Sequence, residues 1–220
     1  QIEISTTPFY HPILPLLCDS DVAAVPHPGV PLPPRVHYPQ DAREQLERAR
    51  AYMLEMFGVE PVGLWPSEGS VSDHALALAY EAGFTWAASD NGVLGRTLNC
   101  DPGVDVTYRP YVWQQAGREM RMIFRDHYLS DLIGFEYSRM DPRDAAGHFL
   151  HRIRENAAGR DVLVPIILDG ENAWEYYEAN GRPFLRELYR RISEDPGMRA
   201  LTVSEAFTKF EAEPLQGIFP

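Results

Sequence analysis

The chain has few cysteines, no long apolar run and no excess of basic residues, and each shortage excludes a class of protein. Two cysteines, Cys18 and Cys100, are too few for a disulfide framework and lack metal-ligand spacing, so we expect reduced thiols and a cytoplasmic location. No apolar stretch approaches the roughly 20 residues that a membrane span needs. The net charge of −12 argues against nucleic acid or an anionic membrane as a partner. A neutral substrate is compatible with that charge.

Length and composition are those of an ordinary globular protein. A chain of 220 residues with 45% hydrophobic residues can bury a sizeable core as one domain. The sequence shows no internal repeats, low-complexity tracts or clear linker. It begins abruptly at residues 1–3 (Gln-Ile-Glu), in what reads as the middle of a strand. We therefore expect residues 1–220 to be one domain that is truncated at its N-terminus.

Strand and helix patterns alternate along the chain, which is typical of β/α architectures. A long loop rich in proline and histidine is expected over residues 8–39. Apolar periodicity and capping residues predict helices over residues 41–57, 72–80, 141–158, from 183 onward and from 204 onward. Short apolar runs predict strands over residues 2–7, 62–65, 84–88, 162–168 and 200–203, with a hairpin or two separate strands at 108–114 and 121–124. Five or six strands are too few for a closed eight-stranded barrel, so we predict an α/β fold with an incomplete or truncated barrel.

Two short carboxylate motifs share one pattern. Residues 63–70 read Gly-Leu-Trp-Pro-Ser-Glu-Gly-Ser, and residues 166–174 read Ile-Ile-Leu-Asp-Gly-Glu-Asn-Ala-Trp. Each motif places an acid, Glu68 or Asp169, where an apolar run ends, beside a glycine and a tryptophan. The ends of parallel strands converge on one face of a β/α fold. Two acids from different strands, with tryptophans that stack on a sugar ring, suit the cleavage of a glycosidic bond, and we predict a carbohydrate-active enzyme.

At these motifs the chain resembles glycoside hydrolase family 57, a group of α-glucan-active enzymes that includes amylopullulanases, α-amylases, 4-α-glucanotransferases and branching enzymes. Residues 65–68 (Trp-Pro-Ser-Glu) are similar to the family's Trp-x-x-Glu motif, whose Glu is the nucleophile. Residues 169–171 (Asp-Gly-Glu) are similar to its Asp-x-Glu motif, whose Asp is the general acid/base. Residues 1–3 resemble the end of its Gly-Gln-hydrophobic-Glu motif. The resemblance continues through residues 6–12, 124–126 and 202–205.

The chain departs from the family pattern at one motif. The family's His-Gln-Pro motif, near the end of its first strand, has no counterpart here. The resemblance therefore implies an incomplete (β/α)7-type barrel of parallel strands that lacks its first strand or strands in this chain. Gly69 follows the predicted nucleophile, where branching enzymes of the family usually carry cysteine, and this favours the amylopullulanase-like branch.

The resemblance also implies the chemistry. Glu68 is expected to be the nucleophile and Asp169 the acid/base of a retaining double displacement, with their carboxyl groups ~5–5.5 Å apart. The expected substrate is an α-glucan or malto-oligosaccharide with α-1,4 bonds; α-1,6 cleavage, the choice between hydrolysis and transglycosylation, and the oligomeric state stay open. We predict no metal and no cofactor. The residues expected to bind or orient substrate are Glu3, His11, Trp65, Asp90, Arg125, Asp126, Glu171 and Trp174.

Simpler interpretations compete with these roles. The two acids could cap helices at strand–helix turns, where carboxylates are favoured. The two tryptophans could be core residues, and His11 a structural loop residue. Arg125 and Asp126 could form an ion pair that only supports the site.

Two other functions remain as alternatives. A metal-dependent deacetylase of a related barrel class would need an Asp and two His at one divalent ion. His11, His74 and Asp90 are the available residues, but their spacing does not match a His-x-x-x-His pair. The second alternative is a non-catalytic glucan-binding or regulatory fragment.

Overall fold

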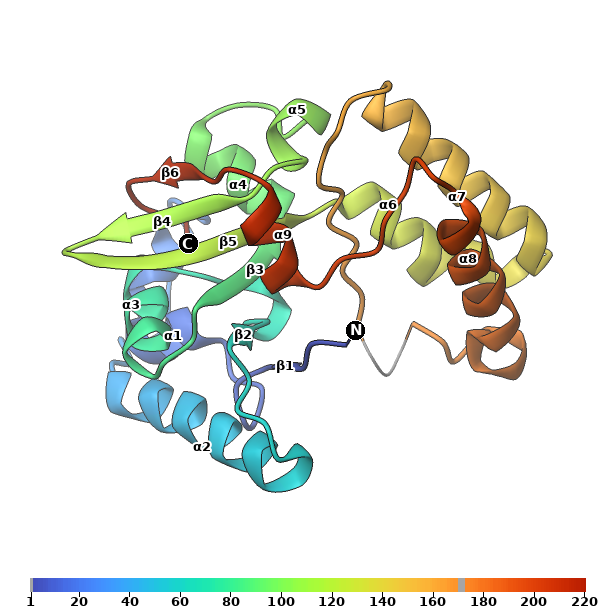
Figure 1. The fold of residues 1–220 in the computed structure, drawn as a ribbon. Helices are drawn as coiled ribbons and strands as arrows, with labels where there is room; N and C mark the ends of the chain where they lie inside the picture. The colour runs from blue at the N-terminus through green and yellow to red at the C-terminus, as the bar shows by residue number, and fades with distance from the viewer. Residues whose placement is uncertain (1, 170–172) are drawn as a thin grey trace.

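The computed structural model describes residues 2–169 and 173–220, so the predicted orienting residue Glu171 lies outside the described residues. The described residues form one six-stranded sheet in the order β1-β2-β3-β5-β4-β6 (Figure 1). Strands β1, β2, β3 and β5 are parallel, β4 is antiparallel to β5, and β6 is parallel to β4. This mostly parallel sheet confirms the predicted α/β class. The strands are β1 (Ser5–Thr6), β2 (Gly63–Leu64), β3 (Trp86–Asp90), β4 (Tyr111–Gln115), β5 (Arg118–Arg125) and β6 (Glu213–Leu215).

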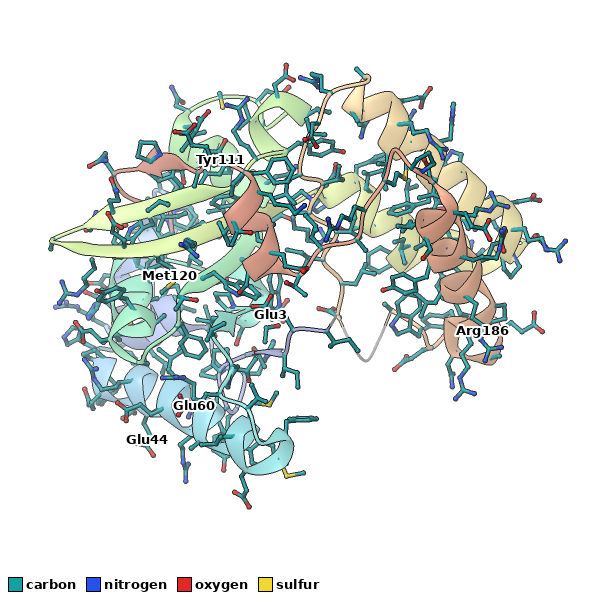
Figure 2. The ribbon with its side chains drawn as sticks, in the orientation of Figure 1. Glu3, Glu44, Glu60, Tyr111, Met120 and Arg186 are labelled. Atoms are coloured by element: carbon teal, nitrogen blue, oxygen red, sulfur yellow. The ribbon has the colours of Figure 1, made fainter. Side chains whose placement is uncertain are left out.

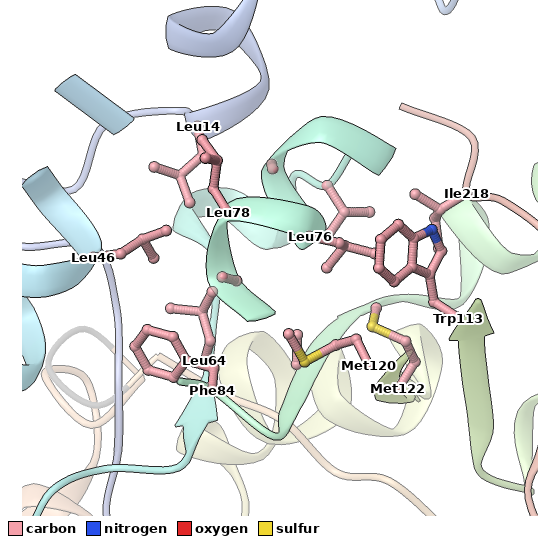
Figure 3. Close-up of a cluster of buried hydrophobic side chains, with 14 of the residues drawn as sticks. Leu14, Leu46, Leu64, Leu76, Leu78, Phe84, Trp113, Met120, Met122 and Ile218 are labelled. Carbon is pink, nitrogen blue, oxygen red and sulfur yellow. The ribbon is translucent and has the colours of Figure 1, made fainter. Parts of the chain in front are cut away.

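Helices cover the outer face of this sheet and bury the largest core cluster with it. Side chains from the helices meet alternate side chains of the strands, as Figure 3 shows for Leu46, Leu76, Leu64 and Met122. The helices of this layer are α1 (Leu14–Cys18), α2 (Pro39–Phe57), α3 (Asp73–Glu81) and α4 (Asn91–Leu98). A 3-10 turn over Ser20–Ala24 follows α1, so the predicted loop over residues 8–39 contains two short helical segments.

Local signals explain where the two predicted helices of this layer begin and end. Helix α2 begins with proline at its first turn and ends at Gly58, which adopts a left-handed conformation with φ 69°. The Ser72 side chain caps α3 by accepting a hydrogen bond from the backbone N–H of Ala75. Both predictions are confirmed within two residues at each end.

Of the two alternatives left open for residues 108–124, the structure has the hairpin. Strands β4 and β5 pair as an antiparallel ribbon with Tyr111 opposite Met122 and Gln115 opposite Arg118. The two-residue turn, Ala116-Gly117, has positive φ at both positions (49° and 77°), which is the geometry that matches the twist of such a ribbon.

A second layer of helices packs beside the sheet rather than on it. Helix α7 (Pro142–Ala157) is capped by Asp141, and helix α8 (Arg182–Glu194) begins one residue before its predicted start; both helices are confirmed. The two helices pack against each other. Together with shorter helical segments they bury a second cluster that includes Phe149 and Phe184. The shorter segments are α5 (Val104–Thr107), α6 (His127–Asp131), a π-helix (Leu132–Glu136) and 3-10 turns at Tyr137–Arg139 and Glu178–Gly181.

The strand predicted over residues 162–168 is wrong as a sheet strand, although the segment is extended. It lies between the sheet and the second layer of helices, and in the described chain it pairs in no ladder (Figure 1). Its side chains still alternate. Leu163 and Ile167 pack with Trp86 and Ile123 on the inner face of the sheet, the face opposite helices α1 to α4. Val162, Val164, Ile166 and Leu168 pack into the helical cluster. Pro165 has no backbone N–H, so it interrupts the donor pattern of a regular ladder at that position.

The strand predicted over residues 200–203 is wrong as well. Helix α9 (Val203–Lys209) starts at the end of that segment, one residue before its predicted start, and Thr202 is its cap. Thr202 and Glu205 form a capping box, and this local pairing favours helix over strand. Helix α9 packs Val203 and Phe207 on the inner face of the sheet.

Two smaller predictions concern the thiols and the membrane. Both cysteines are free, and burial raises the pKa of the Cys18 thiol to about 11. Within the described ranges, no helix combines the length and the apolar character needed to cross a bilayer. The cytoplasmic location stays a prediction.

Candidate active site

The inner face of the sheet gathers the residues that the sequence selects at strand ends. Gly63 is the register partner of Trp86, and Asp90 is the register partner of Arg125. A Cβ on Gly63 would lie 1.9 Å from the Trp86 indole, so only glycine lets that ring lie across β2. The indole of Trp65 packs against the inner cluster formed by Trp86, Ala88 and Ile123. Trp65 lies two residues beyond Gly63, nearer the carboxyl ends of the strands.

Glu68 stands on a strained turn directly after β2. The 3-10 turn Ser67–Gly69 holds Glu68 at φ 57°, a left-handed conformation that is uncommon for a residue with a side chain. His11 also has φ 57°, and its Nε2 lies 3.2 Å from Glu68 Oε1. Both side chains are open to solvent, with exposed fractions of 73% for Glu68 and 50% for His11. Strain of this kind persists only where the surroundings enforce it, and it is found often at active sites.

A third residue fixes the orientation of the His11 ring. Thr7 Oγ1 lies 3.2 Å from His11 Nδ1. If the Thr7 hydroxyl donates to Nδ1, the ring proton resides on Nε2 and points to the Glu68 carboxylate. The structure therefore brings together two residues of the predicted site, Glu68 and His11, and adds Thr7 as their support.

The residues that flank Glu68 hold the turn in place. Gly69 has φ 67°, and a Cβ there would lie 3.1 Å from the Trp65 ring, so glycine lets the indole approach the turn. The buried hydroxyl of Ser89 donates a hydrogen bond to the Gly69 carbonyl at 2.6 Å. This bond ties the Glu68 turn to β3.

An ionic cluster occupies the ends of β3 and β5. Arg125 donates to Asp90 (Nη1–Oδ2 3.2 Å) and pairs with Asp131 through its other terminal nitrogen. His127 places Nδ1 3.0 Å from Asp90 Oδ2 and Nε2 3.0 Å from Asp131 Oδ2. Asp90 also caps α4 by accepting from the Gly92 N–H at 2.8 Å.

Two members of this cluster, His127 and Asp131, are not among the site residues predicted from the sequence. The available signal was their spacing of four residues directly after a strand that ends in Arg125, because such spacing places both on one face of a helix.

The structure separates Asp126 from its neighbour Arg125. Asp126 is buried, caps α6 through the Leu129 N–H at 2.8 Å, and accepts a hydrogen bond from the Tyr108 hydroxyl at 2.6 Å. Asn156 of α7 donates to the same hydroxyl at 2.8 Å. Burial, reinforced by the hydrogen bond to Asp126, raises the pKa of Tyr108. This network ties the sheet to the second helical layer; a substrate contact by Asp126 stays a prediction.

Glu3 lies on the inner side, between β3 and α9 (Figure 2). Its carboxylate accepts from the Trp86 indole N–H at 3.0 Å and from the Ser204 N–H at 2.9 Å. Partial burial raises the pKa of Glu3, but the hydrogen bonds from Ser204 and Trp86 outweigh it and lower the pKa below its usual value. The described contacts make Glu3 a support for Trp86 and α9.

Asp169 ends the extended segment that runs past this cluster. Its side chain is exposed. The side chains of Leu163 and Ile167 both face the inner cluster that also contains Trp65. Asp169 has the same parity, so the alternation, if continued, puts its carboxyl group on that side as well.

Trp174 packs in a different place from Trp65. Its ring centroid lies 5.4 Å from that of Tyr177 in the helical cluster. A Cβ on Gly181 would lie 2.4 Å from the Trp174 ring, so the indole rests against that backbone. A sugar contact by Trp174 stays a prediction, as does that of Glu171, outside the described residues.

Other features of the described surface lie apart from these acids. One hollow of about 340 Å³ lies in the second helical layer and is lined by Tyr137, Tyr177 and Phe184 among others, but by none of the candidate residues. Within residues 2–169 and 173–220, no three His, Cys, Asp or Glu side chains are grouped in a way that could hold a metal ion.

Comparison with known proteins gives the family. A model of glycosyl hydrolase family 57 matches residues 1–217, so the chain belongs to that family. No curated protein matches.

Solved structures of the family share the fold. The chain is similar to a 4-alpha-glucanotransferase from Thermococcus litoralis (TM-score 0.73, 21% identity, 100% of this chain and 30% of that one). It is similar to the alpha-amylase AmyC from Thermotoga maritima (TM-score 0.72, 16% identity, 99% of this chain and 51% of that one). It is also similar to a GH57-type branching enzyme from Pyrococcus horikoshii (TM-score 0.69, 13% identity, 98% of this chain and 47% of that one). The chain spans between 30% and 51% of these proteins, and the likeness supports the predicted incomplete (β/α)7-type barrel.

Proposed function

We propose that the protein is a retaining, α-glucan-active glycoside hydrolase or transglycosylase, with Glu68 as nucleophile and Asp169 as general acid/base. The observation that carries the proposal is the Glu68 turn: an exposed carboxylate in a strained conformation at the carboxyl end of β2, with His11 Nε2 3.2 Å away. A helix-capping acid needs neither the strain nor the histidine. We further propose that residues 1–220 act as one catalytic domain.

In the first step, Glu68 attacks the anomeric carbon while Asp169 donates its proton to the glycosidic oxygen, so the bond breaks and the leaving glucan departs as an alcohol. In the second step, Asp169 takes a proton from water or from a sugar hydroxyl. That oxygen attacks the anomeric carbon, and the ester bond to Glu68 breaks. Two inversions leave the anomeric configuration retained. His11, which contacts Glu68, orients the nucleophile.

Support for the substrate comes from the family and from Trp65. The similar structures are described as a glucanotransferase, an alpha-amylase and a branching enzyme, which favours an α-glucan or malto-oligosaccharide. Trp65 is half-buried on the inner face beside the Glu68 turn, where one face of its indole can stack on a sugar ring. α-1,4 bonds are the proposed target, with α-1,6 bonds as the second possibility.

Product analysis with the full-length protein tests this function. Maltoheptaose should yield shorter or redistributed malto-oligosaccharides, and NMR of the first products should show the α-anomer. Products longer than the substrate indicate transglycosylation, and cleavage of pullulan at its branch-type linkages indicates α-1,6 activity. Binding without turnover would favour the glucan-binding alternative, and a β-anomer as first product would contradict the retaining mechanism.

A further inference from the structure

The extended segment that ends at Asp169 has no ladder partner in the described chain, yet both main-chain groups of Ile167 are held by side chains. Ser130 accepts from the Ile167 N–H, and Arg125 donates to the Ile167 carbonyl. We propose that Ser130 and Arg125 are positioning residues that hold Asp169 where it can transfer a proton. This inference rests on the proposed function, because it assigns a task to Asp169.

Ser130 is built into the fold as an acceptor. It is completely buried in α6, and its Oγ lies 3.2 Å from the Ile167 nitrogen. Helix α6 is fixed at its first turn by the Asp126 cap, so the hydroxyl of Ser130 is presented from a rigid element. A buried backbone N–H without an acceptor is costly, and here a side chain replaces the missing strand partner.

Arg125 binds the carbonyl group of Ile167. Its Nε donates to the Ile167 carbonyl at 3.0 Å, while its two terminal nitrogens bind Asp90 and Asp131. The Arg125 side chain is 16% exposed, so each guanidinium nitrogen has a protein partner and little of the group faces solvent. The geometry suits a residue that acts through the main chain rather than one that contacts sugar.

Further hydrogen bonds anchor the segment at alternate residues before Ile167. The Leu163 N–H donates to the Tyr108 carbonyl at 3.3 Å, and the Asp126 N–H donates to the Pro165 carbonyl at 2.9 Å. Among the hydrogen bonds of the described residues, the one at Ile167 is the last anchor before Asp169, two residues further on. Losing it therefore frees the end of the segment that carries the acid, and proton transfer is sensitive to shifts of about 1 Å.

The test compares two substrates in the full-length Ser130→Ala variant. A malto-oligosaccharide has a poor leaving group and needs the proton from Asp169, so its kcat/KM should fall about tenfold. An aryl maltoside with an activated phenolate leaving group needs little protonation, so its kcat/KM, which reports the attack by Glu68, should change by less than about twofold. A purely structural role would lower both values by the same factor.

Thr97 provides a matched control. Its hydroxyl accepts a hydrogen bond from the Phe219 N–H at 3.0 Å, which is the same kind of long-range contact, but neither residue belongs to the site. Thr97→Val should therefore leave both kcat/KM values unchanged. Arg125→Lys is the second test variant, for use if Ser130→Ala does not fold: it keeps a cation near Asp90 and loses the Nε–H, and the same selective loss is expected.

Two results overturn the proposal. One is an equal loss on both substrates, or no loss on either, in Ser130→Ala and Arg125→Lys. The other is the selective loss appearing in Thr97→Val. Asp169→Ala measured beside them separates the two claims: if it shows the leaving-group dependence and Ser130→Ala does not, only the positioning role fails. If Asp169→Ala lacks that dependence, the proposed function itself fails.

Discussion

The ends of the two acid-bearing segments look alike in sequence but are supported in different ways. Glu68 follows a strand that pairs on both sides; Ser89 ties its turn to β3, and His11 contacts its carboxylate. Asp169 follows a segment with no ladder partner in the described chain, anchored at Ile167 by side chains. The difference fits two chemical tasks. In the proposed mechanism Glu68 attacks one atom, whereas Asp169 serves a leaving oxygen and then an incoming one.

The largest expected effect is at Glu68. Glu68→Gln replaces the carboxylate of the proposed nucleophile by an amide of nearly the same volume, so turnover of a soluble glucan should fall below a few per cent (~10²-fold or more) with circular dichroism unchanged. Reducing-end release and far-UV spectra are the measurements. More residual activity than that would remove Glu68 from the mechanism and with it the contrast between the two ends.

A smaller effect is expected at the tryptophan beside Glu68. Trp65→Ala should raise KM and lower kcat on malto-oligosaccharides, because the indole is half-exposed and available to a sugar. The free energy of unfolding should fall by less than the ~3–5 kcal/mol typical of a fully buried aromatic residue. Kinetics and urea unfolding of the same variant decide the point. A large stability loss with unchanged kinetics would make Trp65 a core residue only.

The smallest effect is expected at Glu3, whose carboxylate accepts hydrogen bonds from Trp86 and Ser204. The hydrogen bonds from Ser204 and Trp86, which exceed the opposing effect of burial, lower the pKa of Glu3 from its usual value of 4.5. A carboxyl group whose pKa is lower in the folded state stabilises the fold above its unfolded pKa, and this contribution is lost as the pH falls through the folded pKa.

Glu3→Gln should therefore lower Tm at pH 7 by a few degrees, and the difference from the unchanged protein should shrink below about pH 4.5. Thermal unfolding at pH 7 and pH 3.5 measures it. Glu205→Gln, which weakens only the α9 capping box, is a useful control for the neighbourhood of Ser204. A Tm difference that is constant or grows on acidification would contradict the supporting role of the Glu3 carboxylate.

Local sequence signals predicted most of the helices and strands. The wrong prediction at residues 162–168 arises from contacts with residues that are distant in sequence. Helices with caps, such as α3 and α7, and the hairpin turn at Ala116-Gly117 follow from neighbouring residues. The segment over residues 162–168 has the alternation of a strand, but the sequence cannot show that a distant serine and arginine take the place of its ladder partner.

For the site, the sequence could select candidate residues but not all of their contacts. Residues at the ends of apolar runs could be selected, and the contact between Glu68 and His11 brings two of them together. The different contacts within the Arg125-Asp126-His127 turn could not be predicted, because adjacent side chains point to opposite sides: Asp126 binds the Tyr108 hydroxyl, and its two neighbours bind Asp90. Only the backbone direction at the end of β5 decides this.

The most direct test of the central claim is azide rescue of Asp169→Ala. Without its acid/base the enzyme should still attack an activated aryl maltoside through Glu68, accumulate the glycosyl-enzyme, and be rescued by azide, which needs no base. The proposed roles of the two acids predict an α-glycosyl azide, with retained configuration, from Asp169→Ala, and at most the inverted β-azide from a Glu68 variant. Rescue of neither variant, or an inverted product from Asp169→Ala, would contradict the assignment of the two acids.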